Sequence, residues 1–190
     1  MSSDVILVIV ICTALAFDFT NGFHDTANVV ATSISTGAAR PQVAIAMAAL
    51  LNFVGAFISI SVAATVANDV VDAGVITPTI VFAGLIGAIT WNLITWWFGL
   101  PSSSSHALIG GVVGSAVAAV GFDAVLTEGL VGKVLVPAVV APILAFTVAG
   151  LGIGIIYRIV GRQRPGIVSR GFKHGQVISG GLLALAHGTN

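Results

Sequence analysis

The amino-acid sequence predicts an all-α polytopic membrane protein with about five to six transmembrane helices and with broken or re-entrant polar segments. Hydrophobic residues make up 57% of the chain and charged residues only 7%, whereas a soluble domain usually has about 25% charged residues. Apolar stretches of about 18 residues or more, the length that marks a transmembrane helix, recur along the chain. This combination excludes an ordinary water-soluble globule.

Six apolar stretches, separated by polar segments, supply the predicted helices. They cover residues of about 4–17, 42–67, 78–99, 107–122, 134–157 and from 176 onward. The first is short for a crossing, which takes about 20 residues, so it can continue into the polar segment that follows. Gly22 and Gly37 flank that segment and would let a helix break there, exposing backbone groups to a bound ion.

The distribution of charge predicts the orientation in the membrane. Five of the seven Lys and Arg residues lie between positions 158 and 173, and loops rich in these residues are cytoplasmic. Counting back five crossings places the N-terminus outside the cell and Arg40 inside, with Lys133 as the exception. The loop acids that then fall outside are Asp69, Asp72, Asp123 and Glu128. We therefore expect a multi-pass protein of the plasma membrane.

The last residues resemble the polar segment near the N-terminus. Aligning Gly22–Asp25 with Gly188–Asn190 places Asn190 opposite His24. Because five crossings precede the second copy, it would enter the membrane upside down, as in transporters built from inverted repeats. This predicts the first half of such a transporter, which needs a second half of the same polypeptide. The predicted divisions are a first repeat (1–157), a cytoplasmic loop (158–174) and the truncated start of a second repeat (175–190).

The segment Asn21–Asn28 places ionisable groups between two apolar stretches. Such groups are costly inside a membrane and usually mark a functional site. Asp25 and Asn28 are three residues apart, so on a helix they share a face and would suit a proton or a hard cation. His24 titrates near neutral pH when unperturbed and could carry a proton together with Asp25. The alternative is that the two side chains only hydrogen-bond inside a helix bundle.

A second polar segment, Ser102–Ser105, follows Pro101 and precedes an apolar stretch. It has the character of a helix N-terminus, where hydroxyls, free backbone N–H groups and the helix dipole suit an oxyanion. His106 could add another donor. The alternative is a serine-rich helix cap without a ligand.

Three sequence motifs resemble those of the PiT inorganic phosphate transporters. They are Asn21–Thr32, Phe98–Gly110 and Ala184–Asn190. The resemblance implies symport of inorganic phosphate coupled to H+ or Na+, with no cofactor. Many relatives have asparagine where His24 stands, and this difference resembles the bacterial, proton-coupled, low-affinity branch, in which a neutral metal-phosphate complex is a candidate for the species moved. The resemblance covers the first half of such a transporter.

The resemblance also assigns roles to residues of this chain. Those expected to couple the ion are His24, Asp25, Asn28 and Asn190. Those expected to bind phosphate are Asp25, Thr26, Asn28, Ser102, Ser103, Ser104, Ser105 and His106. No resident metal site is assigned.

Other functions share these polar features. A channel or a symporter for another anion, such as sulfate, would use the same groups. An intramembrane serine hydrolase is disfavoured because nothing marks one serine as a nucleophile, so we expect no enzyme. The expected partners are phosphate, the lipid bilayer, the second half of the polypeptide and a homo-oligomer. No basic cluster points to nucleic acid.

Overall fold

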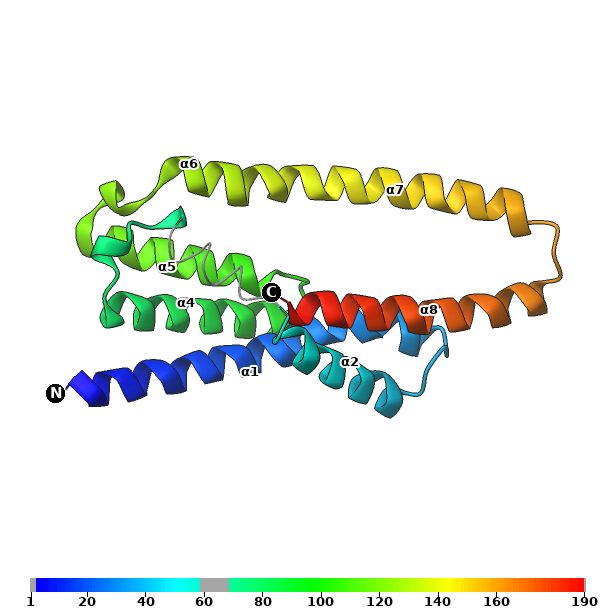
Figure 1. The fold of residues 1–190 in the computed structure, drawn as a ribbon, viewed down its shortest axis with the longest axis horizontal. Helices are drawn as coiled ribbons and strands as arrows, with labels where there is room; N and C mark the ends of the chain where they lie inside the picture. The colour runs from blue at the N-terminus through cyan, green and yellow to red at the C-terminus, as the bar shows by residue number, and fades with distance from the viewer. Residues whose placement is uncertain (1–2, 59–68, 190) are drawn as a thin grey trace.

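The computed structural model describes residues 3–58 and 69–189, and its long helices run roughly along one axis (Figure 1). The two long apolar helices at its edges are α1 (Ser3–Ser35) and α7 (Val136–Val160). The other helices of more than ten residues are α2 (Pro41–Gly55), α4 (Pro78–Trp97), α5 (Ser104–Val120) and α8 (Pro165–Gly188). The shorter pieces are η2 (Ala73–Val75), η3 (Phe122–Ala124), α6 (Thr127–Leu130) and η4 (Val131–Leu135).

Three segments are long and apolar enough to cross a membrane, which agrees with the predicted all-α membrane protein. They are Asp4–Ser35, Pro78–Trp97 and Thr127–Val160. The last combines α6, the π-helical turn η4 and α7 into one continuous run. The helices α2 and α5 are apolar but shorter.

The N-terminal helix does not break at Gly22, so that expectation is wrong. A glycine inside a helix costs only about 1 kcal/mol relative to alanine, which permits a break but does not force one. The helix instead continues through the whole first polar segment to Ser35. Gly37, with φ of 63°, follows the end of the helix in the left-handed conformation that glycine adopts readily. The polar groups of α1 are therefore held on a regular helix.

The second polar segment does interrupt the helices, and it forms the turn of an antiparallel hairpin between α4 and α5 (Figure 1). The two helices of the hairpin pack so closely that a side chain at Gly111 would overlap the backbone of Gly84. Ser115 reinforces the contact by donating a hydrogen bond to the carbonyl oxygen of Ile80, at 2.9 Å. The hairpin thereby carries its turn, residues 98–103, to the middle of the molecule beside α1.

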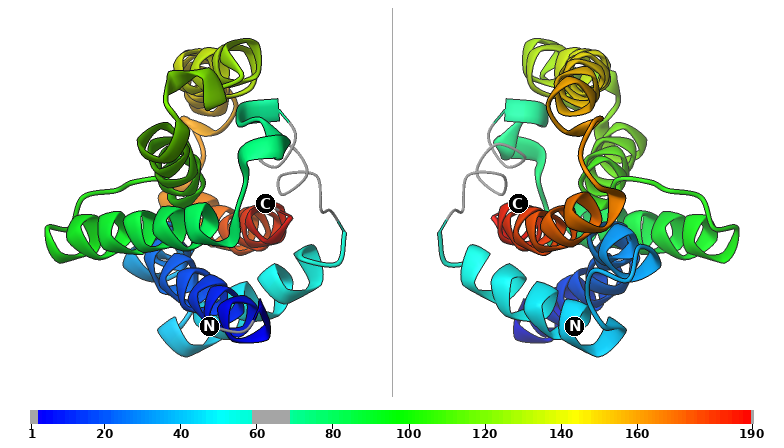
Figure 2. Two further views of the ribbon diagram at one scale, coloured as in Figure 1. Left: turned by 90° about the vertical axis from the view of Figure 1, so that its left-hand side faces the viewer. Right: turned by 90° about the vertical axis from the view of Figure 1, so that its right-hand side faces the viewer.

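The helices α2 and α8 pack against each other and against α1 on the other side of this turn. Figure 2 shows α7 standing apart from that bundle. Within Val136–Val160, all of which is described, no residue is buried. The apolar side chains of α7 therefore face outward, as suits contact with lipid.

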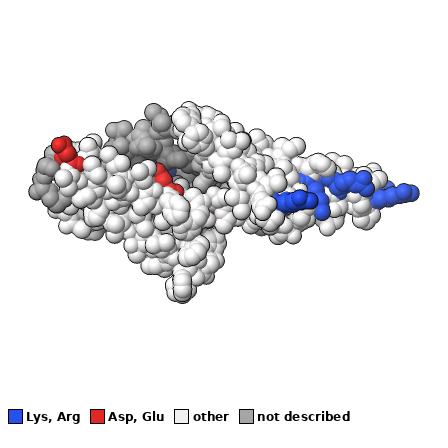
Figure 3. All heavy atoms as spheres, turned by 90° about the horizontal axis from the view of Figure 1, so that it is seen from below, with Lys and Arg blue, Asp and Glu red and all other residues white. Residues whose placement is uncertain are grey.

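Charge is separated along the long axis. Figure 3 shows lysine and arginine side chains gathered at one end of the molecule, where the loop between α7 and α8 lies (Figure 1). The N-terminus, η2 and η3 lie toward the opposite end. There Lys133, the exception among the cations, pairs with Asp69 at 2.6 Å. This arrangement fits the charge pattern of the sequence, and the assignment of the cationic end to the cytoplasm stays a prediction.

Replacing Gly111 by alanine should destabilise the hairpin, because the new Cβ would meet the Gly84 backbone and the two helices would have to separate. We expect a loss of about 1–3 kcal/mol, measured as a lower midpoint of thermal unfolding in detergent. Gly114→Ala is the matched control on the same helix, since no described atom lies within 4 Å of the Cβ it would add. Equal destabilisation by both variants would contradict the packing described.

Candidate anion and proton site

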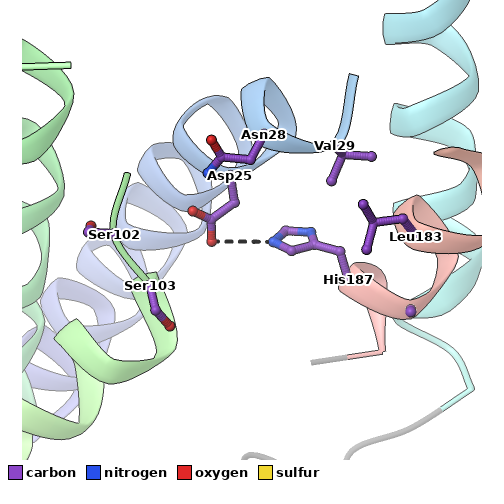
Figure 4. A pocket seen from close by; sticks show the side chains of 8 residues that line it. Asp25, Asn28, Val29, Ser102, Ser103, Leu183 and His187 are labelled. Atoms are coloured by element: carbon purple, nitrogen blue, oxygen red, sulfur yellow. Dashed lines mark hydrogen bonds and ion pairs between the residues drawn. The ribbon is translucent and has the colours of Figure 1, made fainter. Parts of the chain in front are cut away.

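Three segments distant in sequence meet at the centre of the molecule and border an open pocket of about 340 Å³. Figure 4 shows Asp25 and Asn28 on α1, Ser102 and Ser103 on the hairpin turn, and His187 on α8 around this space. The apolar remainder of the wall consists of Val29, Leu183 and Ala186. The pocket therefore has polar groups from three directions in an otherwise apolar setting.

Asp25 lies between two histidines. Its Oδ1 is 2.8 Å from Nδ1 of His24, which is buried, and its Oδ2 is 3.3 Å from Nε2 of His187. A carboxylate in an apolar interior needs such donors, because an unpaired charge there costs several kcal/mol or more. The contact between Asp25 and His187 joins residues that are 162 positions apart in the chain.

A chain of hydrogen bonds connects His24 to the turn of the hairpin, residues 98–103, which carries Ser102 and Ser103 and is called the serine turn below. Nε2 of His24 is 3.1 Å from Oγ1 of Thr95, and Thr95 Oγ1 is 3.1 Å from Oγ of Ser102. Thr95 also donates toward the carbonyl oxygen of Trp91, at 2.9 Å. Thr95 thus joins helices, as buried polar residues in membranes often do, and it also connects the acid to the candidate anion loop.

The serine turn is a helix cap that also borders the pocket. Oγ of Ser103 accepts a hydrogen bond from the backbone N–H of His106 and lies 2.8 Å from the Nδ1 of that histidine. Ser104 is buried, and its hydroxyl has no hydrogen-bond partner among the described residues. The N-terminus of α5, with its positive dipole end and free N–H groups, lies beside the pocket. The cap and anion-binding interpretations are therefore compatible.

The chain matches the phosphate transporter family over residues 21–190. It is 56% identical to a probable low-affinity inorganic phosphate transporter of Mycobacterium tuberculosis, over 97% of this chain and 44% of the relative. The chain belongs to the phosphate transporter family. A similarly named transporter of Bacillus subtilis is 44% identical over 97% of this chain and 55% of its own. The chain thus spans about half the length of these family members.

A solved structure titled "The sodium-dependent phosphate transporter" shares the fold. Its TM-score is 0.75 and its identity 21%, over 97% of this chain and 55% of that one. The matched family is named for transport and the relatives are named as transporters, not enzymes. This agrees with the PiT resemblance found in the sequence and argues against an intramembrane hydrolase.

The structure brings some predicted residues of this phosphate transporter family member together and separates others. Asp25, Asn28, Ser102 and Ser103 line the pocket, and His24 is bonded to Asp25 behind it. The predicted residues that are not among its lining side chains are Thr26, Ser104, Ser105 and His106. His106 lines a second pocket together with Trp91, and Ser103 borders both pockets. Asn190 lies outside the described residues.

Two polar residues of the centre were missed by the sequence analysis. His187 contacts Asp25, and Asn52 contacts His187 at 2.6 Å. An ionisable residue in an apolar helix is itself a signal of function, and His187 stands within the third family motif. The alignment with the first motif had directed attention to Asn190 instead. Among the described residues, no group of three or more His, Cys, Asp or Glu side chains could hold a metal ion.

Replacing Thr95 by valine should destabilise the protein, because the valine keeps the volume but leaves Nε2 of the buried His24 without its partner. We expect a loss of about 1–3 kcal/mol, measured by thermal unfolding. Thr90→Val is the matched control, since Thr90 is exposed and, within the described residues, its hydroxyl bonds to a carbonyl of its own helix. The effect of this control should stay within about 0.5 kcal/mol. A Thr95→Val protein as stable as the unmodified one would show that this hydrogen-bond chain does not stabilise the fold.

Proposed function

We propose that this protein takes part in symport of inorganic phosphate coupled to protons, with phosphate moved as the free anion or as a metal-phosphate complex. The observation that supports this most is that Asp25, which contacts two histidines, lines the same pocket as the serine turn. One part of the site suits a proton and the other an anion. The relatives named as inorganic phosphate transporters support the choice of anion.

The anion is proposed to bind between the serine turn and Asn28. Hydroxyls of Ser102 and Ser103, the carboxamide of Asn28 and the N–H groups at the start of α5 would donate to phosphate oxygens. A negative charge brought beside Asp25 is repelled unless a cation accompanies it. A proton on the histidine–aspartate group would provide that compensation, which links the two transported species.

The relatives are about twice as long as this chain, so the proposed transport unit includes a second half that completes the site. We place the unit in the plasma membrane, with the cationic end in the cytoplasm and the N-terminus outside, as the positive-inside rule predicts. Assembly into a homo-oligomer is part of the same proposal.

A sodium-coupled symporter is the second candidate. The observation that favours it is the shared fold with the solved transporter titled sodium-dependent. Radiolabelled phosphate uptake by the full-length protein in proteoliposomes separates the two, when a proton gradient or a sodium gradient is imposed alone. Uptake with the proton gradient alone is the result expected here. Uptake that requires sodium would reject proton coupling.

Asp25→Asn should abolish proton-driven phosphate uptake, because the amide cannot carry the charge that His24 and His187 compensate. Uptake should fall to the level of empty liposomes while the protein still inserts and runs as a single species in size-exclusion chromatography. Asp18→Asn is the matched control, an exposed aspartate two turns earlier on α1. Normal proton-driven uptake by Asp25→Asn would exclude the carboxylate from the mechanism.

Alanine at both Ser102 and Ser103 should weaken phosphate affinity more than coupling. Each lost hydrogen bond to a charged ligand is worth about 1.5–3 kcal/mol, so the half-saturation concentration of phosphate should rise at least about 10-fold. The number of protons moved per phosphate should be unchanged. Ser179→Ala, at an exposed serine of α8, is the control, and an unaltered half-saturation concentration in the double variant would rule out the serine turn as the anion site.

A further inference from the structure

His187 is the polar residue that α8 contributes to the pocket, and both of its ring nitrogens have partners. Nδ1 is 2.6 Å from Oδ1 of Asn52 on α2, and Nε2 is 3.3 Å from Oδ2 of Asp25 on α1. Figure 4 shows the ring directed from α8 toward the carboxylate. The imidazole therefore connects three helices at the wall where an anion would bind.

The orientation of the Asn52 amide is fixed by its own helix. Its Nδ2 donates a hydrogen bond to the carbonyl oxygen of Ala48, at 2.8 Å. A flipped amide would instead place Oδ1 against that carbonyl oxygen, with two acceptors facing each other. Oδ1 of Asn52 therefore faces His187 and can only accept, so Nδ1 of His187 must carry a hydrogen.

The second nitrogen of His187 also faces an acceptor. Nε2 of His187 lies 3.3 Å from Oδ2 of Asp25, and Nδ1 of His24 lies 2.8 Å from Oδ1. Both oxygens of a carboxylate only accept, so a bare lone pair on Nε2 of His187 would be repelled by Oδ2. A hydrogen on Nε2 removes this repulsion and makes the pair an ion pair.

We propose that His187 is a doubly protonated imidazolium in this conformation and forms the positive charge of the phosphate pocket. His24 has a different second partner, since its Nε2 faces the hydroxyl of Thr95, which carries one hydrogen and also lies 2.9 Å from the carbonyl oxygen of Trp91. His187 is thus the histidine on Asp25 whose two ring nitrogens face an amide oxygen and a carboxylate oxygen.

Among the described residues, few charged groups lie close enough to His187 to affect its protonation. From α1, Asp25 is the charged group paired with His187, and His24 contacts the other oxygen of that carboxylate. The helix α2 (Pro41–Gly55) has no titratable residue. On α8 itself, His174 bonds to the backbone of Arg170 more than three turns away. The charge of His187 is therefore governed by Asp25, Asn52 and whatever occupies the pocket.

This inference rests on the proposed function for its consequence. An anion in the pocket and a proton on His187 carry opposite charges, so each would raise the affinity for the other by the same factor. Loss of the proton would leave Nε2 or Nδ1 facing an acceptor. Phosphate affinity and the protonation of His187 would then change together, which is what coupled transport requires.

The direct test is solid-state nitrogen NMR of the full-length protein in lipid at pH 7, with 15N-labelled histidine. An imidazolium gives two similar nitrogen shifts, whereas a neutral ring gives two widely separated ones. The His187 signals are assigned by their loss in His187→Gln. We expect the imidazolium pattern in the unmodified protein and the neutral pattern in Asn52→Leu, which removes the acceptor for Nδ1–H. Gln176→Leu, a polar-to-apolar change at a partly buried residue of α8 that contacts Thr36 and does not line the pocket, should keep the imidazolium pattern.

A neutral His187 ring in the unmodified protein would overturn the inference, as would an imidazolium pattern unaffected in Asn52→Leu. The half-saturation concentration for phosphate should also rise at least about 10-fold in His187→Gln, and an unchanged value would reject a role in anion binding. The spectrum does not depend on transport. A neutral His187 in a protein with proton-driven uptake therefore rejects this inference alone, while an imidazolium in a protein without such uptake rejects the proposed function alone.

Discussion

The centre of this protein depends on one carboxylate placed inside an apolar helical bundle. A charge on Asp25 needs hydrogen-bonding partners there, and its two oxygens meet His24 on the same helix and His187 on α8. The contact with His187 joins α8 to α1 at this point. The serine turn is connected to the same group through Thr95, so the polar elements form one network.

Small residues make this convergence possible. A side chain at Gly55 would meet the backbone of Leu185 and Gly188, and one at Gly111 would meet Gly84. Without a hydrophobic drive between helices in lipid, close packing of this kind holds them together. The two tight contacts lie on the two sides of the pocket, one within the hairpin and one between α2 and α8. The polar network is thus positioned by backbones in direct contact.

The sequence was informative where a polar residue interrupts an apolar run. Asp25, Asn28 and the serines after Pro101 stand out for that reason, and four of them do line the pocket. The expected helix break at Gly22 was wrong, because glycine permits a break but the surrounding packing decides whether one occurs, and α1 continues through this position. It missed the Asn52–His187 contact because those residues are 135 positions apart. The sequence does not show that α2 and α8 meet at Gly55 and Gly188, which brings the two side chains together.

The charge of the assembled group gives a physical reason for cotransport. In the proposed pair, the charge of the Asp25 carboxylate and that of the His187 imidazolium cancel, which suits the apolar surroundings. A phosphate anion entering alone would add negative charge in a medium that solvates it poorly. A second positive species must accompany it or be held at the site already. In this arrangement coupling follows from the cost of placing an uncompensated anion beside Asp25. The serine turn provides hydrogen-bond donors to the anion without changing the net charge of the site.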